Sequence, residues 1–101
     1  MKKAVRIEPE DNVAVVVQDV AQGENVDCSG LEVKSANAIA KGHKIALSSI
    51  PTGGDIVKYA VVIGKASHDI VPGEHVHSHN VEDITDRLCN EYAQQFRAMK
   101  G

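Results

Sequence analysis

The sequence predicts a compact all-β domain of short strands and glycine turns, followed by a C-terminal α-helix. Apolar residues make up 43% of the 101 residues and are mostly Val, Ile and Ala, whereas aromatic residues make up 3%. Branched apolar residues of this kind favour strands. Glycine turns recur at short intervals up to residue 76, and apolar residues at helical spacing begin only after residue 82. A chain of this length forms one domain with a modest core.

The first two strands are expected on either side of a turn near the N-terminus. Val5 and Ile7 alternate with polar residues, and a continuous apolar run occupies residues 13–17. Residues 8–12 between them contain Pro, Asp and Asn, which are typical of turns. The pattern therefore predicts two strands joined by a hairpin or a corner.

One short pattern then occurs four times and predicts four tight turns. In each copy a branched residue precedes a glycine by three positions, and a second branched residue follows the glycine by three positions. A sharp reversal usually needs one residue at positive φ, which glycine adopts without a steric clash, while the branched residues anchor both arms in the core. The irregular spacing of the copies excludes a solenoid. The copies are Val20-x-x-Gly23-x-x-Val26, Ile39-x-x-Gly42-x-x-Ile45, Ile50-x-x-Gly53-x-x-Ile56 and Ile70-x-x-Gly73-x-x-Val76.

The later elements are two strands and a helix. Residues 45–47 predict a short strand, and residues 56–63 predict the longest strand, which Gly64 is expected to end. From residue 83 the apolar residues recur at helical spacing, so we divide the chain into a β domain (1–82) and an amphipathic helix (83–101). The apolar stripe of this helix either packs on its own sheet or docks on a partner chain, which includes a second copy in a homo-oligomer. It consists of Ile84, Leu88, Tyr92, Phe96 and Met99.

Composition argues against several classes of protein. The formal net charge is −3 and no basic run is longer than Lys2-Lys3, so nucleic acid is not an expected partner. No apolar segment is long enough to cross a bilayer, and the N-terminus does not resemble a signal peptide, so we expect a cytoplasmic protein without a membrane partner. Cys28 and Cys89 have no CxxC spacing, which argues against a structural zinc site or a disulfide framework.

The chemically distinctive segment is Gly73–Asn80, which contains three of the five histidines. In an extended strand His75, His77 and His79 would share one face. They could bind a metal, move protons on a substrate, or line a solvated edge. The Cα atoms of the outer two would lie roughly 13 Å apart in a straight strand, so at most two imidazoles should share one ion. His43, after the turn at Gly42, is the most obvious further ligand, ahead of His68.

Several ordered motifs resemble a known family. Residues 42–47 (GHKIAL), 56–59 (IVKY) and 73–80 (GEHVHSHN) are similar to the small domain of altronate and galactarate dehydratases, which is of the SAF type with a β-clip fold. The resemblance covers about residues 4–82. Ala60 departs from it, because the family commonly has glycine there. The small subunit of sulfolactate sulfo-lyase is similar as well, and the sequence does not separate the two substrates.

The resemblance implies a subunit of a hydro-lyase that removes water from a sugar acid, usually with iron(II). In that family the small domain precedes a larger catalytic region or accompanies it as a separate subunit. Because this chain stops at Gly101, we expect the separate small subunit, inactive alone and bound to a large catalytic dehydratase subunit. The alternative is a non-catalytic carbohydrate-binding or assembly module with the same fold.

We expect the histidines to form one wall of a shared active site. Removing a β-hydroxyl from a polyhydroxy acid needs a base, stabilisation of an enediolate, and an acid or metal at the leaving group, and a small domain rarely encloses all three. The candidate residues for proton transfer or auxiliary ligation are His43, His75 and His77. Of these, His75 and His77 are the candidate metal ligands. The expected metal is a divalent ion, iron(II), held mainly by the partner subunit. Candidate contacts to substrate carboxylate or hydroxyls are Lys44, His79 and Asn80. This assignment requires the turns at Gly42 and Gly73 to lie side by side.

Overall fold

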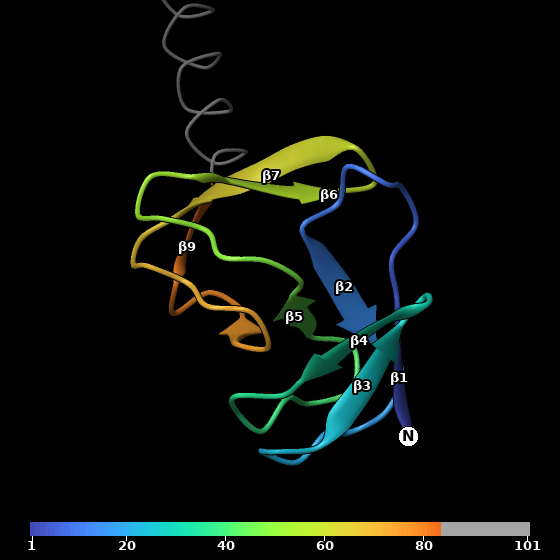
Figure 1. Ribbon diagram of the computed structural model, residues 1–101. Helices are drawn as coiled ribbons and strands as arrows, with labels where there is room; N and C mark the ends of the chain where they lie inside the picture. The colour runs from blue at the N-terminus through green and yellow to red at the C-terminus, as the bar shows by residue number, and fades with distance from the viewer. Residues whose placement is uncertain (84–101) are drawn as a thin grey trace, which may run out of the picture.

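The computed structural model describes residues 1–83, which fold into nine short β-strands in two curled sheets (Figure 1). The predicted all-β domain is therefore confirmed for this part of the chain. The predicted helix lies outside the described residues except for Asp83, which ends the last strand. The strands are β1 (Lys2–Val5), β2 (Val13–Val16), β3 (Asn25–Cys28), β4 (Leu31–Lys34), β5 (Lys44–Ala46), β6 (Asp55–Lys58), β7 (Val61–Ala66), β8 (His75–Val76) and β9 (Val81–Asp83).

The larger sheet has the strand order β4-β3-β1-β2-β5-β8, and the smaller has the order β6-β7-β9. Only the pairing of β1 with β3 is parallel among these strands. Asn12, just before β2, joins the two sheets: its backbone N–H donates to the Val57 carbonyl (3.2 Å), and its Oδ1 accepts from the Val57 N–H (2.8 Å). β6 consequently lies against the start of β2 (Figure 1).

The larger sheet curls until its two edges meet. The Ala36 N–H, after β4, donates to the Gly73 carbonyl (2.8 Å), and the Gly73 N–H donates to the Ala46 carbonyl (2.8 Å). At this point the backbones approach so closely that a Cβ on Gly73 would overlap the carbonyl oxygen of Lys34. Glycine is required here by space as well as by backbone conformation.

The four predicted glycine turns are confirmed, because each glycine of the pattern has a φ between 82° and 87°. The branched residues before these glycines pair across isolated bridges, Val20 with Ile39 and Ile50 with Ile70. Each bridge belongs to a separate hydrophobic cluster of buried residues. The chain thus builds one arrangement twice, first over residues 20–46 and then over residues 50–76.

Three details differ from the sequence prediction. The single long strand predicted over residues 56–63 is wrong, because β6 ends at Lys58 and β7 begins at Val61. Tyr59 and Ala60 form the intervening turn with φ of 56° and 59°, although neither is a typical turn residue. Gly64 does not end a strand but lies within β7, where an added Cβ would be 2.7 Å from the Glu82 carbonyl oxygen of β9. The hairpin of β3 and β4 was not predicted.

Candidate functional site

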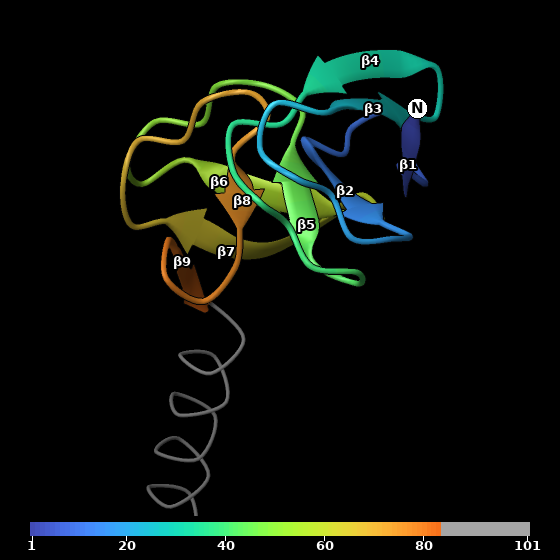
Figure 2. The same cartoon turned by 90° about the horizontal axis from the view of Figure 1, so that it is seen from below.

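The pairing of β5 with β8 brings two distant histidines together. These strands are antiparallel, with Ile45 opposite His75 and Lys44 opposite Val76. The turns at Gly42 and Gly73 therefore lie side by side, as the site hypothesis requires, and Figure 2 shows β5 between β8 and β2. His43 and His75 are both half-buried at this edge.

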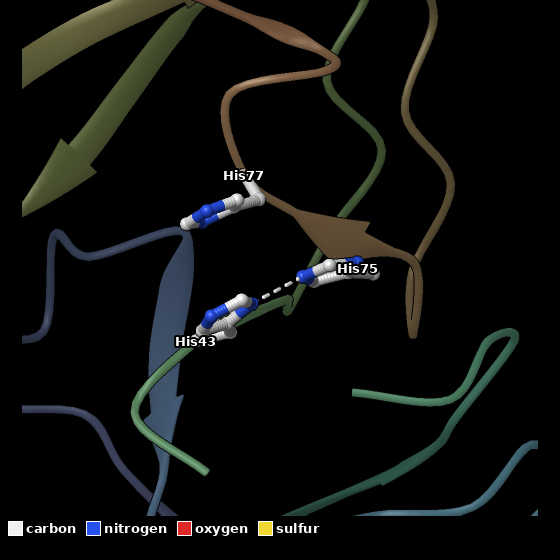
Figure 3. Close-up of side chains that lie close together, drawn as sticks. All are labelled: His43, His75 and His77. Carbon is white, nitrogen blue, oxygen red and sulfur yellow. Dashed lines mark hydrogen bonds between the residues drawn. The ribbon is translucent and has the colours of Figure 1, made fainter. Parts of the chain in front are cut away.

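Three imidazole rings lie close together and nearly parallel (Figure 3). The ring of His43 lies 4.0 Å from that of His77 between centroids, with 8° between their planes, and 5.1 Å from that of His75, with 15° between their planes. Nδ1 of His43 and Nε2 of His75 are 2.9 Å apart, a hydrogen-bonding distance. One nitrogen from each ring lies within 4.8 Å of the others, so the three can approach a common ligand. We call these three residues the histidine cluster.

The extended strand predicted through His79 is wrong beyond Val76, where β8 ends. A turn follows, in which the Asn80 N–H donates to the His77 carbonyl (3.1 Å). The ring of His79 consequently lies 5.0 Å from that of His75 between centroids, tilted by 43°. A local interaction favours the turn over the predicted strand, because an asparagine side chain offers hydrogen bonds to the nearby backbone.

Asn80 is 3% exposed and its amide is fully used inside this turn. Its Oδ1 accepts from the His77 N–H (2.9 Å), and its Nδ2 donates to the His75 carbonyl (2.8 Å) and to Oε2 of Glu74 (3.1 Å). The structure thus gives Asn80 a role in holding the turn, while a contact with substrate stays a prediction. Asn37, which the sequence did not point to, accepts from the His75 N–H (3.0 Å).

The neutral imidazole is favoured at His75 and His77. Burial is the main cause that lowers the pKa of His75, with further lowering by His79, His43, His77 and Lys44 nearby. The pKa of His77 is lowered by burial first and then by His43, Lys44 and His79. Burial also lowers the pKa of Lys44, and the charge of Lys58 adds to this. Neutral imidazole can accept a proton or bind a metal ion.

An open depression of about 380 Å³ adjoins the cluster. His43 and His75 line one part of it, and the bridge residues Val20 and Ile39 line another, together with Asp19, Ala38 and Ala40. The cluster is therefore accessible from outside the domain. His68, the other ligand considered from the sequence, is exposed and lies beside Ser67, with 3.0 Å between Nδ1 and the hydroxyl oxygen.

The donor set fits a divalent transition metal ion. Three imidazoles suit zinc, iron and similar ions, and open positions would remain for ligands from elsewhere. Around an ion with metal–nitrogen distances of about 2.0–2.1 Å, the three nitrogens would be roughly 3 Å apart. The present spacing, within 4.8 Å, is wider than this, so binding an ion requires the imidazole side chains to rotate.

Fold and site define a small β module with a histidine cluster beside an open depression, and comparison with known proteins shows its family. The SAF domain of altronate/galactarate dehydratases matches residues 2–84. The chain belongs to this family. The described part of the chain contains no helix long and apolar enough to cross a membrane.

Three curated relatives show how this module is used. The altronate dehydratase of Bacillus subtilis (strain 168) is 39% identical over 97 residues, which is 95% of this chain and 20% of that protein. The altronate dehydratase of Escherichia coli (strain K12) is 42% identical over 94 residues, which is 92% of this chain and 19% of that protein. The (2R)-sulfolactate sulfo-lyase subunit alpha of Paracoccus pantotrophus is 39% identical over 54 residues, 54% of this chain and 81% of that subunit. This chain therefore spans about a fifth of the length of the dehydratases it matches.

Proposed function

We propose that this chain is the small subunit of a cytoplasmic sugar-acid dehydratase of the altronate/galactarate type. It contributes the histidine cluster as one wall of an active site that a larger catalytic subunit completes. The observation that carries this proposal is the cluster itself, which is open to the outside on a domain matching about a fifth of the altronate dehydratases. Alone, this subunit is inactive.

The residues of the cluster handle protons at the shared site. An imidazole of His43 or His75 accepts the proton of a weakly acidic C–H or passes it to the leaving hydroxyl. Lys44 supplies positive charge for the substrate carboxylate, since it lies on β5 directly after His43. His79, next to His75, contacts a substrate hydroxyl. Asn80 acts on the substrate only if the turn that uses its amide rearranges.

His75 and His77, joined by His43, are the residues of this chain that would hold a divalent metal, iron(II). When bound, such an ion supplies Lewis acidity at the leaving hydroxyl. The lowered pKa values of His75 and His77 support this role, because a metal ion competes with protons for the imidazole nitrogen. The large subunit provides the remaining ligands.

A second candidate is the small subunit of a sulfolactate sulfo-lyase. It is favoured by the match to the alpha subunit of such an enzyme, of which this chain covers 81%. The two candidates differ in the leaving group, hydroxide or sulfite, while the same cluster serves either. A third possibility, a binding or assembly module without a catalytic role, predicts ligand binding by this chain alone and no effect on turnover.

Reconstitution with the large subunit separates these functions. The chain is mixed with its co-purifying larger partner, with and without iron(II), and incubated with altronate, galactarate or sulfolactate. We expect a keto-deoxy sugar acid to form only when both subunits are present. His75→Ala with His77→Ala should abolish turnover, whereas His68→Ala, which changes an exposed histidine outside the cluster, should not. Unchanged turnover and unchanged metal content in the double variant would refute the proposal.

A further inference from the structure

We propose that Asn37 and Asn80 are positioning residues that fix the spacing of His75 and His77, and thereby the affinity of the histidine cluster for a divalent metal ion. This inference rests on the proposed metal-binding role of the cluster. It assigns a role to two side chains that lie 43 positions apart in the sequence and both hydrogen-bond to the backbone of His75.

His75 is held at both of its backbone polar groups by asparagine side chains. Its N–H donates to Oδ1 of Asn37 (3.0 Å), and its carbonyl accepts from Nδ2 of Asn80 (2.8 Å). The next histidine is held in the same way, since the His77 N–H donates to Oδ1 of Asn80 (2.9 Å). One amide, that of Asn80, therefore bridges the backbones of two cluster histidines.

The pairing of strands in the sheet does not supply these hydrogen bonds to His75 and His77. β8 has only two residues and is an edge strand of the larger sheet among the described strands. Its ladder with β5 fixes the backbone opposite Lys44 and Ile45 and stops there. Beyond Val76 the chain turns, so the side chains supply the hydrogen bonds that a longer strand would obtain from a neighbour.

The two asparagines use different atoms of their amides, so substitution by aspartate should affect them differently. Asn80 needs both ends of its amide, because Nδ2 donates to the His75 carbonyl and to the Glu74 carboxylate while Oδ1 accepts. An aspartate at position 80 would place a carboxylate against two acceptors, which is repulsive. Asn37 contributes only its oxygen to His75, so an aspartate at position 37 can keep that bond.

Residues that orient metal ligands without touching the metal typically change metal affinity by about 10- to 100-fold when they are replaced. The test measures the affinity of the full chain for Co²⁺ by visible absorption. It uses conditions in which circular dichroism shows that each variant is folded. Asn37→Ala and Asn80→Asp should each weaken Co²⁺ binding by about 10- to 100-fold. Asn37→Asp should restore binding. Thr52→Ala, which removes a remote side-chain hydrogen bond to Asp69, is the matched control and should not change it.

A second readout needs no metal. Stacked rings with centroids 4.0 Å apart give a nuclear Overhauser effect between ring protons of His43 and His77. It should weaken in Asn37→Ala and Asn80→Asp but persist in Asn37→Asp and Thr52→Ala. Asn37 is exposed, so its variants keep the test valid even if Asn80→Asp does not fold.

The two readouts separate the possible failures. If neither the wild-type chain nor its complex with the large subunit binds Co²⁺, the metal-binding part of the proposed function fails, and the ring contacts alone decide on positioning. If Asn37→Ala and Asn80→Asp have the same Co²⁺ affinity and the same ring contacts as the wild type, the positioning role is overturned. If Asn37→Asp binds as weakly as Asn37→Ala, the Asn37 hydrogen bond is not the cause and its role is overturned.

Discussion

Among glycine-to-alanine substitutions in the described part of the chain, Gly73→Ala should lower the free energy of unfolding most. Gly73 has a φ of 87°, and its added Cβ would overlap the carbonyl oxygen of Lys34, where the edges of the larger sheet meet. A non-glycine residue in this conformation costs about 1–2 kcal/mol. Relieving the overlap also separates backbones that share the hydrogen bonds to Ala36 and Ala46, each with a net contribution of about 1 kcal/mol. The expected loss is therefore about 3–4 kcal/mol.

Gly23→Ala is the matched control. Gly23 has nearly the same φ, 85°, but nothing lies within 4 Å of an added Cβ, so only the conformational cost of about 1–2 kcal/mol applies. Urea unfolding followed by circular dichroism measures both free energies of unfolding. Equal losses in the two variants would refute the steric argument. Gly73→Ala should also weaken Co²⁺ binding, because Gly73 lies two residues before His75.

Three further predictions concern other parts of the molecule. Burial raises the pKa of Asp11, but backbone N–H donors, led by that of Ala60, outweigh it and lower the pKa below 3.8. The folded state then binds fewer protons than the unfolded state, so this carboxylate contributes stability that is lost as the pH falls through the pKa of the unfolded and then of the folded state. Asp11→Asn should reduce the slope of the unfolding free energy in acid titrations, while Asp69, whose pKa is also lowered, still contributes to it. Ala60→Gly, at a φ of 59°, should raise the unfolding free energy by about 0.5–1 kcal/mol. Burial raises the pKa of Cys28 to about 11, so in a Cys89→Ser background a thiol reagent should react only after unfolding.

The sequence predicted those features whose cause is local. A positive φ at a tight turn is a property of one residue, and glycine marks it, so all four turns were found. The turn at Tyr59 and Ala60 was missed because its residues carry no such mark and interrupt an apolar run. Its conformation is held from elsewhere: the Ala60 N–H donates to Oδ1 of Asp11 (2.8 Å), a contact across 49 positions that no local pattern reveals.

The histidine cluster shows the same limit. The alternation of His75, His77 and His79 indicated the segment that contributes two of the three cluster histidines, and His43 was predicted to join them because it follows a glycine turn. The side-by-side arrangement of the two turns could be stated only as a requirement, since it depends on the pairing of β5 with β8. Asn37 had no local signal at all, because its partner lies 38 positions away.

The duplicated architecture explains why the histidine cluster forms where it does. The turns at Gly23 and Gly53 lead into β3 and β6, each of which forms a hairpin with the next strand. The turns at Gly42 and Gly73 lead instead into β5 and β8, which pair with each other. Side chains just after these two turns therefore meet across the halves of the molecule, and these are the positions that carry imidazoles. Of the four glycine turns in residues 1–83, the turns at Gly42 and Gly73 are the ones followed by strands that pair between the two halves.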